Sequence, residues 1–168
     1  MSRYPLVDLD PATLEHIAER GGRPINLYRV LGNQPALLHA WIDFASALRY
    51  QSATPRQLRE LLILRIAQCC QSSYEWSQHL LLARQAGVPE TQIRALEAWR
   101  DSPLFDPRER AALALTEAAA AGRVDDPTHA AAAALFSSAE MTELVLTASF
   151  YCMVARVLDA MAVDNQGE

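Results

Sequence analysis

The segment 69–79, "CCQSSYEWSQH", gathers residue types that can do chemistry. It holds two of the three cysteines and one of the four histidines of the chain. Glu75 and His79 are four residues apart, so on a helix they share a face and can touch. A carboxylate beside an imidazole fixes the tautomer and makes the ring a better base. The segment therefore indicates either an acid/base site or a thiol redox site.

The same spacing also fits the ordinary start of a helix. Ser72 followed three residues later by Glu75 has the pattern of a capping box. In this interpretation the Ser72 side chain caps the helix, the Glu75 side chain bonds back to the Ser72 backbone amide, and His79 pairs with Glu75. Because both interpretations use the same geometry, spacing alone leaves them open. Tyr74 would add a hydroxyl to either arrangement.

The adjacent thiols Cys69 and Cys70 come at the end of the preceding helix. Neighbours on a helix point about 100° apart, so we expect one to face the core and the other to face the site. Redox cysteines are usually spaced Cys-x-x-Cys, with one thiol at a helix N-terminus that lowers its pKa. These two precede that N-terminus, so an incidental role is the alternative. Cys152, in a long apolar segment, is predicted to be core.

Glu60 is the third titratable candidate. Its helix, "PRQLRELLILRIAQCC", is apolar almost all round, which predicts burial. Glu60 either lies on a solvent edge and pairs with Arg56, four residues back, or points into a polar pocket where burial favours its protonated form. Glu60, Glu75 and His79 lack a second histidine at metal-ligand spacing. We therefore expect no metal.

The elements that must position these residues are predicted to be helices. Asp-Pro and Thr-Pro pairs, with caps at Asp10, Thr54, Asp106 and Asp126, mark helix starts. Gly21, Gly87 and Gly122 mark helix ends. The predicted ranges are 11–20, 25–31, 35–49, 55–71, 74–86, 89–99, 107–121, 127–136 and 139–162. Strand signals are missing, so we expect a compact all-α bundle, with one domain over residues 1–168.

Composition excludes several classes of protein. The net charge is −5 and no basic run occurs, which argues against nucleic acid as a partner. All 15 basic residues are arginines, so Schiff-base lysine chemistry is excluded. The N-terminus lacks a signal-peptide pattern, and Glu143 and Arg156 interrupt the C-terminal apolar segment, so we expect a cytoplasmic protein without a membrane contact. Alanine-rich helices favour self-association.

The stretch 59–96, "RELLILRIAQCCQSSYEWSQHLLLARQAGVPETQIRAL", resembles the core of the carboxymuconolactone decarboxylase family, which includes alkylhydroperoxidase D-like proteins. We place the core motif region at 54–99, and "FYCMVARVLDAMAV" resembles the last helix of one subgroup. The resemblance implies an all-helical fold, and trimers or hexamers with the site near a subunit interface. It implies no cofactor and no metal.

The peroxidase branch of this family carries Glu, eleven residues, Cys-x-x-Cys, three residues, then His. On this chain the Glu falls at Glu60 and the His at His79, while the cysteine positions fall at Ser72 and Glu75. Both thiols are missing, which puts peroxidase activity in doubt. What remains is an acid/base site that fits the decarboxylase side of the family. There His79 would donate a proton, and Glu60 would relay it or orient the ring.

Substrate contacts are assigned to the same region. Ser72 or Tyr74 would hydrogen-bond the lactone or enolate oxygen, and Arg65 or Arg84 would hold the substrate carboxylate. Three hypotheses follow: a cofactor-free acid/base enzyme acting on a small carboxylated lactone or enol, a thiol peroxidase that uses Cys69 or Cys70 out of position, and a non-catalytic oligomer that binds a small ligand.

Overall fold

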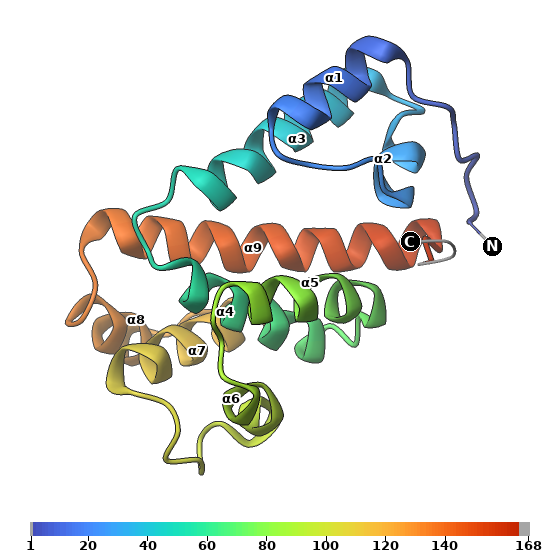
Figure 1. Cartoon of the computed structure of the whole chain (residues 1–168). Helices are drawn as coiled ribbons and strands as arrows, with labels where there is room; N and C mark the ends of the chain where they lie inside the picture. Colours follow the sequence, from blue (N-terminus) through green and yellow to red (C-terminus); the bar gives the residue numbers. More distant parts are fainter. Residues whose placement is uncertain (1, 165–168) are drawn as a thin grey trace. The chain divides into compact units, whose positions relative to one another are not determined.

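The computed structural model describes residues 2–164, and in this range the regular elements are all helices, without a strand (Figure 1). The elements are α1 (Pro11–Glu19), α2 (Asn26–Leu31), α3 (Pro35–Tyr50), α4 (Arg56–Cys69), α5 (Ser73–Gln85), α6 (Glu90–Ala95), the 3-10 helix η1 (Leu96–Ala98), α7 (Pro107–Ala120), α8 (Asp126–Ala133) and α9 (Ser138–Met161). The all-α prediction is confirmed.

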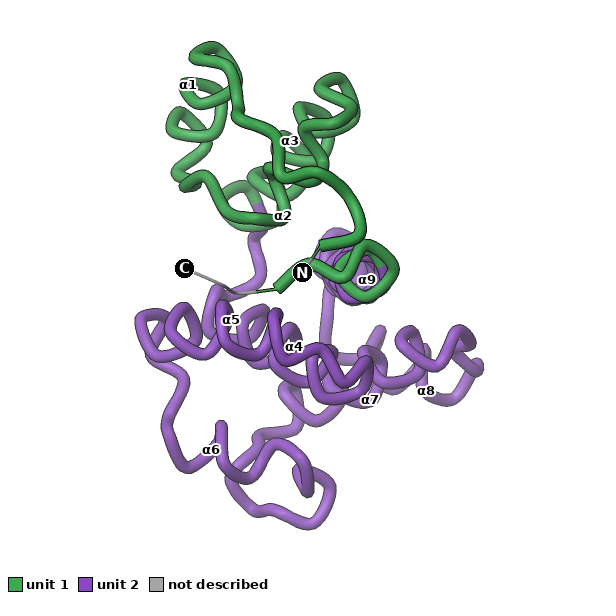
Figure 2. The backbone as a smooth tube through the Cα atoms, turned by 90° about the vertical axis from the view of Figure 1, so that its right-hand side faces the viewer, with its two compact units in different colours: residues 1–51, 157–168 green, residues 52–156 purple. Residues whose placement is uncertain are grey.

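The contacts of the chain divide it into two compact units, shown in Figure 2. Unit 1 comprises residues 1–51 and 157–168, and unit 2 comprises residues 52–156. Helix α9 continues from unit 2 into unit 1. The sequence-based assignment of one domain over 1–168 stays a prediction.

Unit 1 is built on α3, against which α1 and α2 both pack. Its two chain segments meet where the Arg3 amide donates to the Met161 carbonyl at 2.9 Å. The Arg3 guanidinium also donates to the Ala160 carbonyl at 2.8 Å, so a cation lies at the C-terminal end of α9. A positive charge is favourable there because the helix dipole leaves carbonyl oxygens unpaired.

Unit 2 positions all of the predicted site residues. Helix α4 packs against α5 and α7, and α7 packs against α8. The core of the unit is aliphatic and aromatic, with fully buried side chains such as Leu61, Leu62, Leu64, Leu113 and Leu144. The predicted burial of α4 follows from its sequence, because an apolar surface that continues round the helix has no face to leave in water.

Most helix ends follow the predicted caps. The Asp10 side chain accepts from the Thr13 amide, and Asp106 forms a complete capping box with Glu109. Two caps were assigned wrongly. Helix α8 is capped by Asp125, so Asp126 is already its first helical residue. Thr54 does not cap α4, because Pro55 is the N-cap residue and no side chain bonds there.

The amides before α4 are held from another helix instead. The Glu143 carboxylate on α9 accepts from the amides of Ala53 and Thr54 at 2.7 and 2.8 Å. The buried Arg59 guanidinium donates to the Thr54 carbonyl. Partial burial acts to raise the pKa of Glu143, but the two amides outweigh it, so the pKa lies below its ordinary value.

Helix α9 is 24 residues long with a mean hydropathy of 1.5 over its most apolar window. By length and composition alone it is sufficient to cross a membrane, so Glu143 and Arg156 do not interrupt it as strongly as the sequence suggested. Half of that window is buried within the structure. The core helix of a water-soluble protein has the same properties.

Candidate acid/base site

The centre of the candidate site is a buried pair between α4 and α5. The His79 Nδ1 atom lies 2.8 Å from the Glu60 Oε2 atom, and only 2% of the Glu60 side chain is exposed. The other oxygen, Oε1, lies 3.4 Å from the Arg56 Nε atom. Glu60 is therefore buried, and the proposed pairing with Arg56 is present as well, without the solvent edge that was expected to accompany it.

This pair orients the imidazole. An ionised carboxylate only accepts hydrogen bonds, so the 2.8 Å contact places the donated proton on His79 Nδ1. The other ring nitrogen, Nε2, is then the one that can take up or release a proton. The Tyr151 ring on α9 packs edge-on against the imidazole, with ring centroids 4.9 Å apart and an interplanar angle of 87°. His79 is thus fixed by Glu60 rather than by Glu75.

Glu75 is buried without a hydrogen-bond partner. Its side chain is 2% exposed, and neither carboxyl oxygen is bonded within the described residues. Burial raises the pKa of Glu75 to about 8, and the neighbouring Ser72 hydroxyl offsets only part of that rise. Glu75 does not complete a capping box and does not bond His79. It is a carboxylic acid that stays largely protonated at neutral pH.

A tight turn between α4 and α5 brings these residues together. The Ser72 amide donates to the Ala67 carbonyl, and the Gln71 amide donates to the Gln68 carbonyl, which is the Schellman pattern. Gln71 takes the left-handed conformation with φ of 54°. Ser72 then caps α5 by accepting from the Glu75 amide at 3.3 Å, so this predicted cap is confirmed.

The two adjacent cysteines differ in their exposure to solvent. Cys69 is exposed and Cys70 is half-buried. The thiols of Cys70 and Cys152 each influence the pKa of the other, and Cys152 is buried as predicted. Desolvation by the surrounding protein raises the pKa of all three thiols, that of Cys152 to about 12, and it acts on Cys69 as well although that residue is exposed. None is a ready nucleophile at neutral pH, because the thiolate is the reactive form.

Both arginines predicted to hold a substrate carboxylate already have an acidic partner. The Arg65 guanidinium donates to Glu117 and to Gln68, both at 2.7 Å. Arg84 is exposed and paired with Glu90 on the far side of the α5–α6 connection. Tyr74 is buried on α5. The roles given to Ser72 and Tyr74 remain predictions.

The sequence did not connect three residues of α9 with the site. Tyr151 lies against His79, Cys152 influences the pKa of Cys70, and the charge of Arg156 lowers the pKa of both Cys70 and Cys152. Glu75 raises the pKa of the same two thiols. The only available signal was the four-residue spacing of Cys152 and Arg156, which places both on one helix face.

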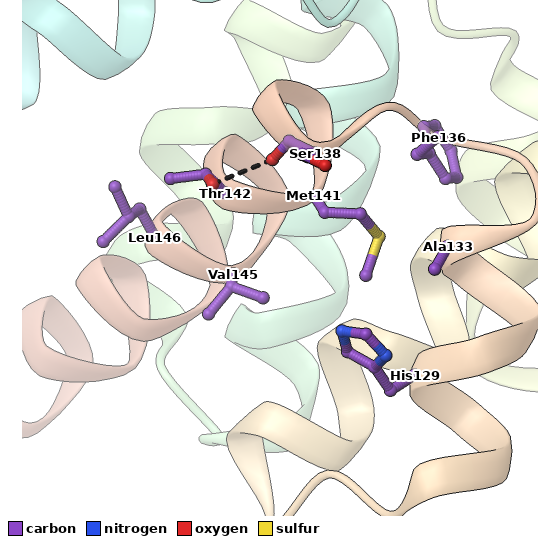
Figure 3. Close-up of a pocket in the computed structure, with 8 residues that line it drawn as sticks. All are labelled: His129, Ala133, Phe136, Ser138, Met141, Thr142, Val145 and Leu146. Atoms are coloured by element: carbon purple, nitrogen blue, oxygen red, sulfur yellow. Dashed lines mark hydrogen bonds between the residues drawn. The ribbon is translucent and has the colours of Figure 1, made fainter.

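A cavity of about 460 Å³ lies elsewhere in unit 2, between α8 and the first half of α9 (Figure 3). Its lining consists of His129, Ala133, Phe136, Ser138, Met141, Thr142, Val145 and Leu146. It contains none of the predicted site residues. Across residues 2–164, no group of three histidine, cysteine or acidic side chains is placed to hold a metal ion.

Comparison with known proteins agrees with this fold. The sequence model of the carboxymuconolactone decarboxylase family matches residues 35–118. The protein YnjA of Escherichia coli K12 is 29% identical over 170 residues, which covers 99% of this chain and 92% of YnjA.

Two solved structures share the architecture at low sequence identity. The debrominase Bmp8 in complex with 2,3,4-tribromopyrrole superposes with a TM-score of 0.83 at 17% identity, covering 99% of this chain and 95% of that one. An AhpD-type protein of unknown function from Agrobacterium tumefaciens gives a TM-score of 0.74 at 20% identity, covering 82% of this chain and 96% of that one. The fold is of the AhpD type, and the chain belongs to the carboxymuconolactone decarboxylase family.

Proposed function

We propose that this protein is a cofactor-free acid/base enzyme that acts on a small carboxylated lactone or enol, by decarboxylation or a related lyase or isomerase reaction. The observation that carries the proposal is the Glu75 carboxyl, buried and without a bonding partner, on the same helix as the His79–Glu60 pair. A carboxylic acid in this condition has a proton to donate, and no acceptor is bonded to it within residues 2–164.

The pairing explains how the two carboxyls take different roles. Glu60 has both of its oxygens engaged, one by the His79 ring and the other by Arg56. Glu75 makes no ion pair within residues 2–164 and stays largely protonated at neutral pH, because burial raises its pKa to about 8. Two carboxyl groups whose environments separate their protonation states are the usual equipment for acid/base catalysis.

In a decarboxylation the carbon–carbon bond to the carboxylate breaks, and its electron pair moves into the conjugated carbonyl to form an enolate. The Glu75 proton would stabilise the enolate oxygen, and a protonated His79 Nε2 would deliver a proton to carbon. Loss of carbon dioxide and uptake of one proton balance the reaction. Without a carboxylate to expel, the same groups would move a proton between two carbons, which is an isomerisation.

We assign the substrate carboxylate to Arg156. This residue is exposed and makes no ion pair within residues 2–164. Its charge lowers the pKa of Cys70 and Cys152, the same two thiols whose pKa Glu75 raises. A guanidinium binds a carboxylate through two parallel hydrogen bonds. Arg65 cannot do so without leaving Glu117.

The test is release of carbon dioxide from a carboxymuconolactone, measured for the wild type and for Glu75→Gln, His79→Gln and Arg156→Gln. Loss of the acid or of the imidazole should lower kcat by about 10²- to 10⁴-fold. Arg156→Gln should raise KM, while Arg84→Gln, which changes an exposed paired arginine, should leave both constants unchanged. Activity should also fall as the pH passes about 8, where Glu75 loses its proton.

Two results would contradict the proposal. One is unchanged turnover in Glu75→Gln. The other is consumption of an organic hydroperoxide with dithiothreitol that Cys70→Ser abolishes, because this would establish a displaced thiol peroxidase. The raised thiol pKa values argue against that second outcome. A non-catalytic ligand-binding protein would account for the satisfied Glu60–His79 pair but not for an unbonded buried acid.

A further inference from the structure

One aromatic ring touches the site histidine and has no part in the acid/base chemistry. Tyr151 on α9 is 5% exposed, and its ring packs edge-on against the His79 imidazole, with the ring centroids 4.9 Å apart and an interplanar angle of 87°. The Glu60 carboxylate reaches the same imidazole from α4. The His79 ring, carried by α5, is therefore held by two other helices.

One hydrogen bond does not fix the plane of an imidazole. The 2.8 Å contact between His79 Nδ1 and Glu60 Oε2 sets which nitrogen carries the proton. The χ2 torsion of histidine has broad wells, so the ring can tilt while such a bond bends and persists. An aromatic ring in edge-on contact restricts the tilt, because the imidazole cannot turn without losing that contact or overlapping its neighbour. The direction of Nε2 then depends on both contacts.

We propose that Tyr151 is a positioning residue of the site, whose ring holds the plane of the His79 imidazole and so directs the Nε2 atom. Glu60 selects the tautomer, and Tyr151 selects the plane. This positioning is a property of the free protein. Only its effect on turnover rests on the proposed acid/base function.

Helix α9 holds the Tyr151 ring at the height of the site. Ala148 and Ala155 are buried one turn before and one turn after Tyr151 on the same face, so the phenol ring is the large side chain of this part of the face. Glu143, about two turns earlier, accepts from the two backbone amides that precede α4. These bonds join α9 to the start of the helix that carries Glu60, so the two restraints on the imidazole are tied together.

The test is nitrogen-15 NMR of the free, full-length protein labelled in its histidine rings, with His79→Gln to assign the signals of that ring. We expect the wild type to show one tautomer, a slowly exchanging Nδ1 proton, and NOE contacts between the ring protons of His79 and Tyr151. In Tyr151→Leu the Nδ1 proton should exchange with water about 10-fold faster, because the loosened ring leaves Glu60 more often.

Two further variants are matched to Tyr151→Leu. Tyr151→Phe removes only the hydroxyl, so it should keep the wild-type Nδ1 proton. Phe105→Leu truncates another buried aromatic ring in the hydrophobic core of unit 2, so it measures the effect of lost packing alone and should also keep that proton. In the proposed reaction Tyr151→Leu should lower kcat by about 10- to 100-fold with KM little changed, since a misdirected proton donor slows the chemical step.

An unchanged Nδ1 proton in Tyr151→Leu would overturn the proposal, because Glu60 alone would then orient the ring. Equal acceleration in Phe105→Leu would overturn it too, by tracing the effect to a loosened core. So would equal acceleration in Tyr151→Phe, which would trace it to the hydroxyl. Unchanged kcat in a Tyr151→Leu protein with altered ring signals would remove the effect on catalysis.

Two features keep the test decisive. If Tyr151→Leu does not fold, the NOE contacts of the wild type decide, because their absence means that the two rings do not touch. The NMR measurement contains no substrate, so its result decides the positioning whether or not the protein releases carbon dioxide from a carboxymuconolactone.

Discussion

At the Glu60 carboxylate, two partners from different helix positions share one charge. His79 is bonded to one oxygen, and Arg56 lies near the other from the exposed side. Removing the imidazole leaves a carboxylate that is 2% exposed with a single, longer contact to Arg56. A buried charge left incompletely paired destabilises the folded state strongly.

His79→Ala should therefore lower the free energy of unfolding by about 3 kcal/mol. The control is His129→Ala, since His129 is an exposed histidine of the same unit and should cost little. Urea unfolding of both variants measures the difference. Equal stabilities would show that the Glu60–His79 contact contributes nothing. Adding Glu60→Gln to His79→Ala should recover part of the loss, because the uncompensated charge is then removed.

The residues of the site could be named from sequence, together with some of their contacts: the Arg56–Glu60 pair was an open alternative, and the family resemblance implied that Glu60 orients the His79 ring. Glu60, Glu75 and His79 stood out by type and spacing, and all three are buried in unit 2. The four-residue spacing pointed to Glu75 as the partner of His79, whereas the family resemblance pointed to Glu60. The bonded partner of His79 is Glu60, chosen by the packing of α4 on α5. Tyr151 and Cys152 come from α9, and no local pattern connects them with His79 or Cys70.

Among the elements, the α4–α5 turn has a glutamine in the left-handed position, and Ala162 after α9 is the other non-glycine residue with positive φ among residues 2–164. The corresponding residues after α5 and α7 are Gly87 and Gly122, with φ of 88° and 86°. Only glycine takes this conformation without steric cost. Gln71 has φ of 54°, so the turn that brings the site together carries local strain.

Gln71→Gly should change stability by no more than about 1 kcal/mol and in the stabilising direction, because relief of the backbone strain outweighs the added freedom of the unfolded chain. Gln71→Val should destabilise by about 1–2 kcal/mol, since a branched side chain is strongly disfavoured at positive φ. The matched control is Gln85→Gly in the last turn of α5, which should destabilise. This account would be contradicted if Gln71→Gly and Gln85→Gly changed the stability in the same direction.

Helix bounds were predictable where a side chain marks them. Asp10 and Asp106 begin helices as expected, and Gly87 and Gly122 end them. The helix predicted over 55–71 ends at Cys69, because its turn is made by Gln71, which gives no signal. Its start was assigned to a Thr54 cap, while the amides there are held by Glu143 from α9. A local sequence pattern does not reveal long-range contacts of this kind.

For the molecule as a whole, the shifted carboxyl groups set the pH range of greatest stability. Asp10, Asp125, Glu140 and Glu143 all have pKa values below their ordinary values, chiefly through hydrogen bonds from amides and hydroxyls at helix starts. For Glu143 those bonds act against burial. The folded state holds these groups ionised, so their contribution is present above about pH 4 and is lost as the pH falls.

Glu75 acts in the opposite direction. Its pKa is raised from 4.5 to about 8 in the folded state, so the folded chain binds a proton that the unfolded chain releases. Stability should therefore decline as the pH rises from about 5 to 8, by as much as about 4 kcal/mol. Combined with the groups above, this predicts a maximum of stability near pH 5.

Urea unfolding between pH 4 and 9 measures this profile. Glu75→Gln has no proton to lose, so the decline between pH 5 and 8 should be largely absent from it, and the variant should be more stable than the wild type at pH 8. A wild-type profile that is flat or rising over this interval would show that Glu75 is ionised in the folded protein. The measurement needs no substrate and is independent of the proposed reaction.

The contact between Glu60 and His79 also fixes the number of residues that can lie between them. The two residues are 19 positions apart, on helices joined by a tight turn. Inserting or deleting one codon within either helical stretch would turn the remainder by about 100° and shift it by about 1.5 Å. The composition of both helices would be almost unchanged, yet the two side chains would no longer meet. Substitutions can alter nearly every surface position here, whereas a change of length between these two residues would remove the site at once.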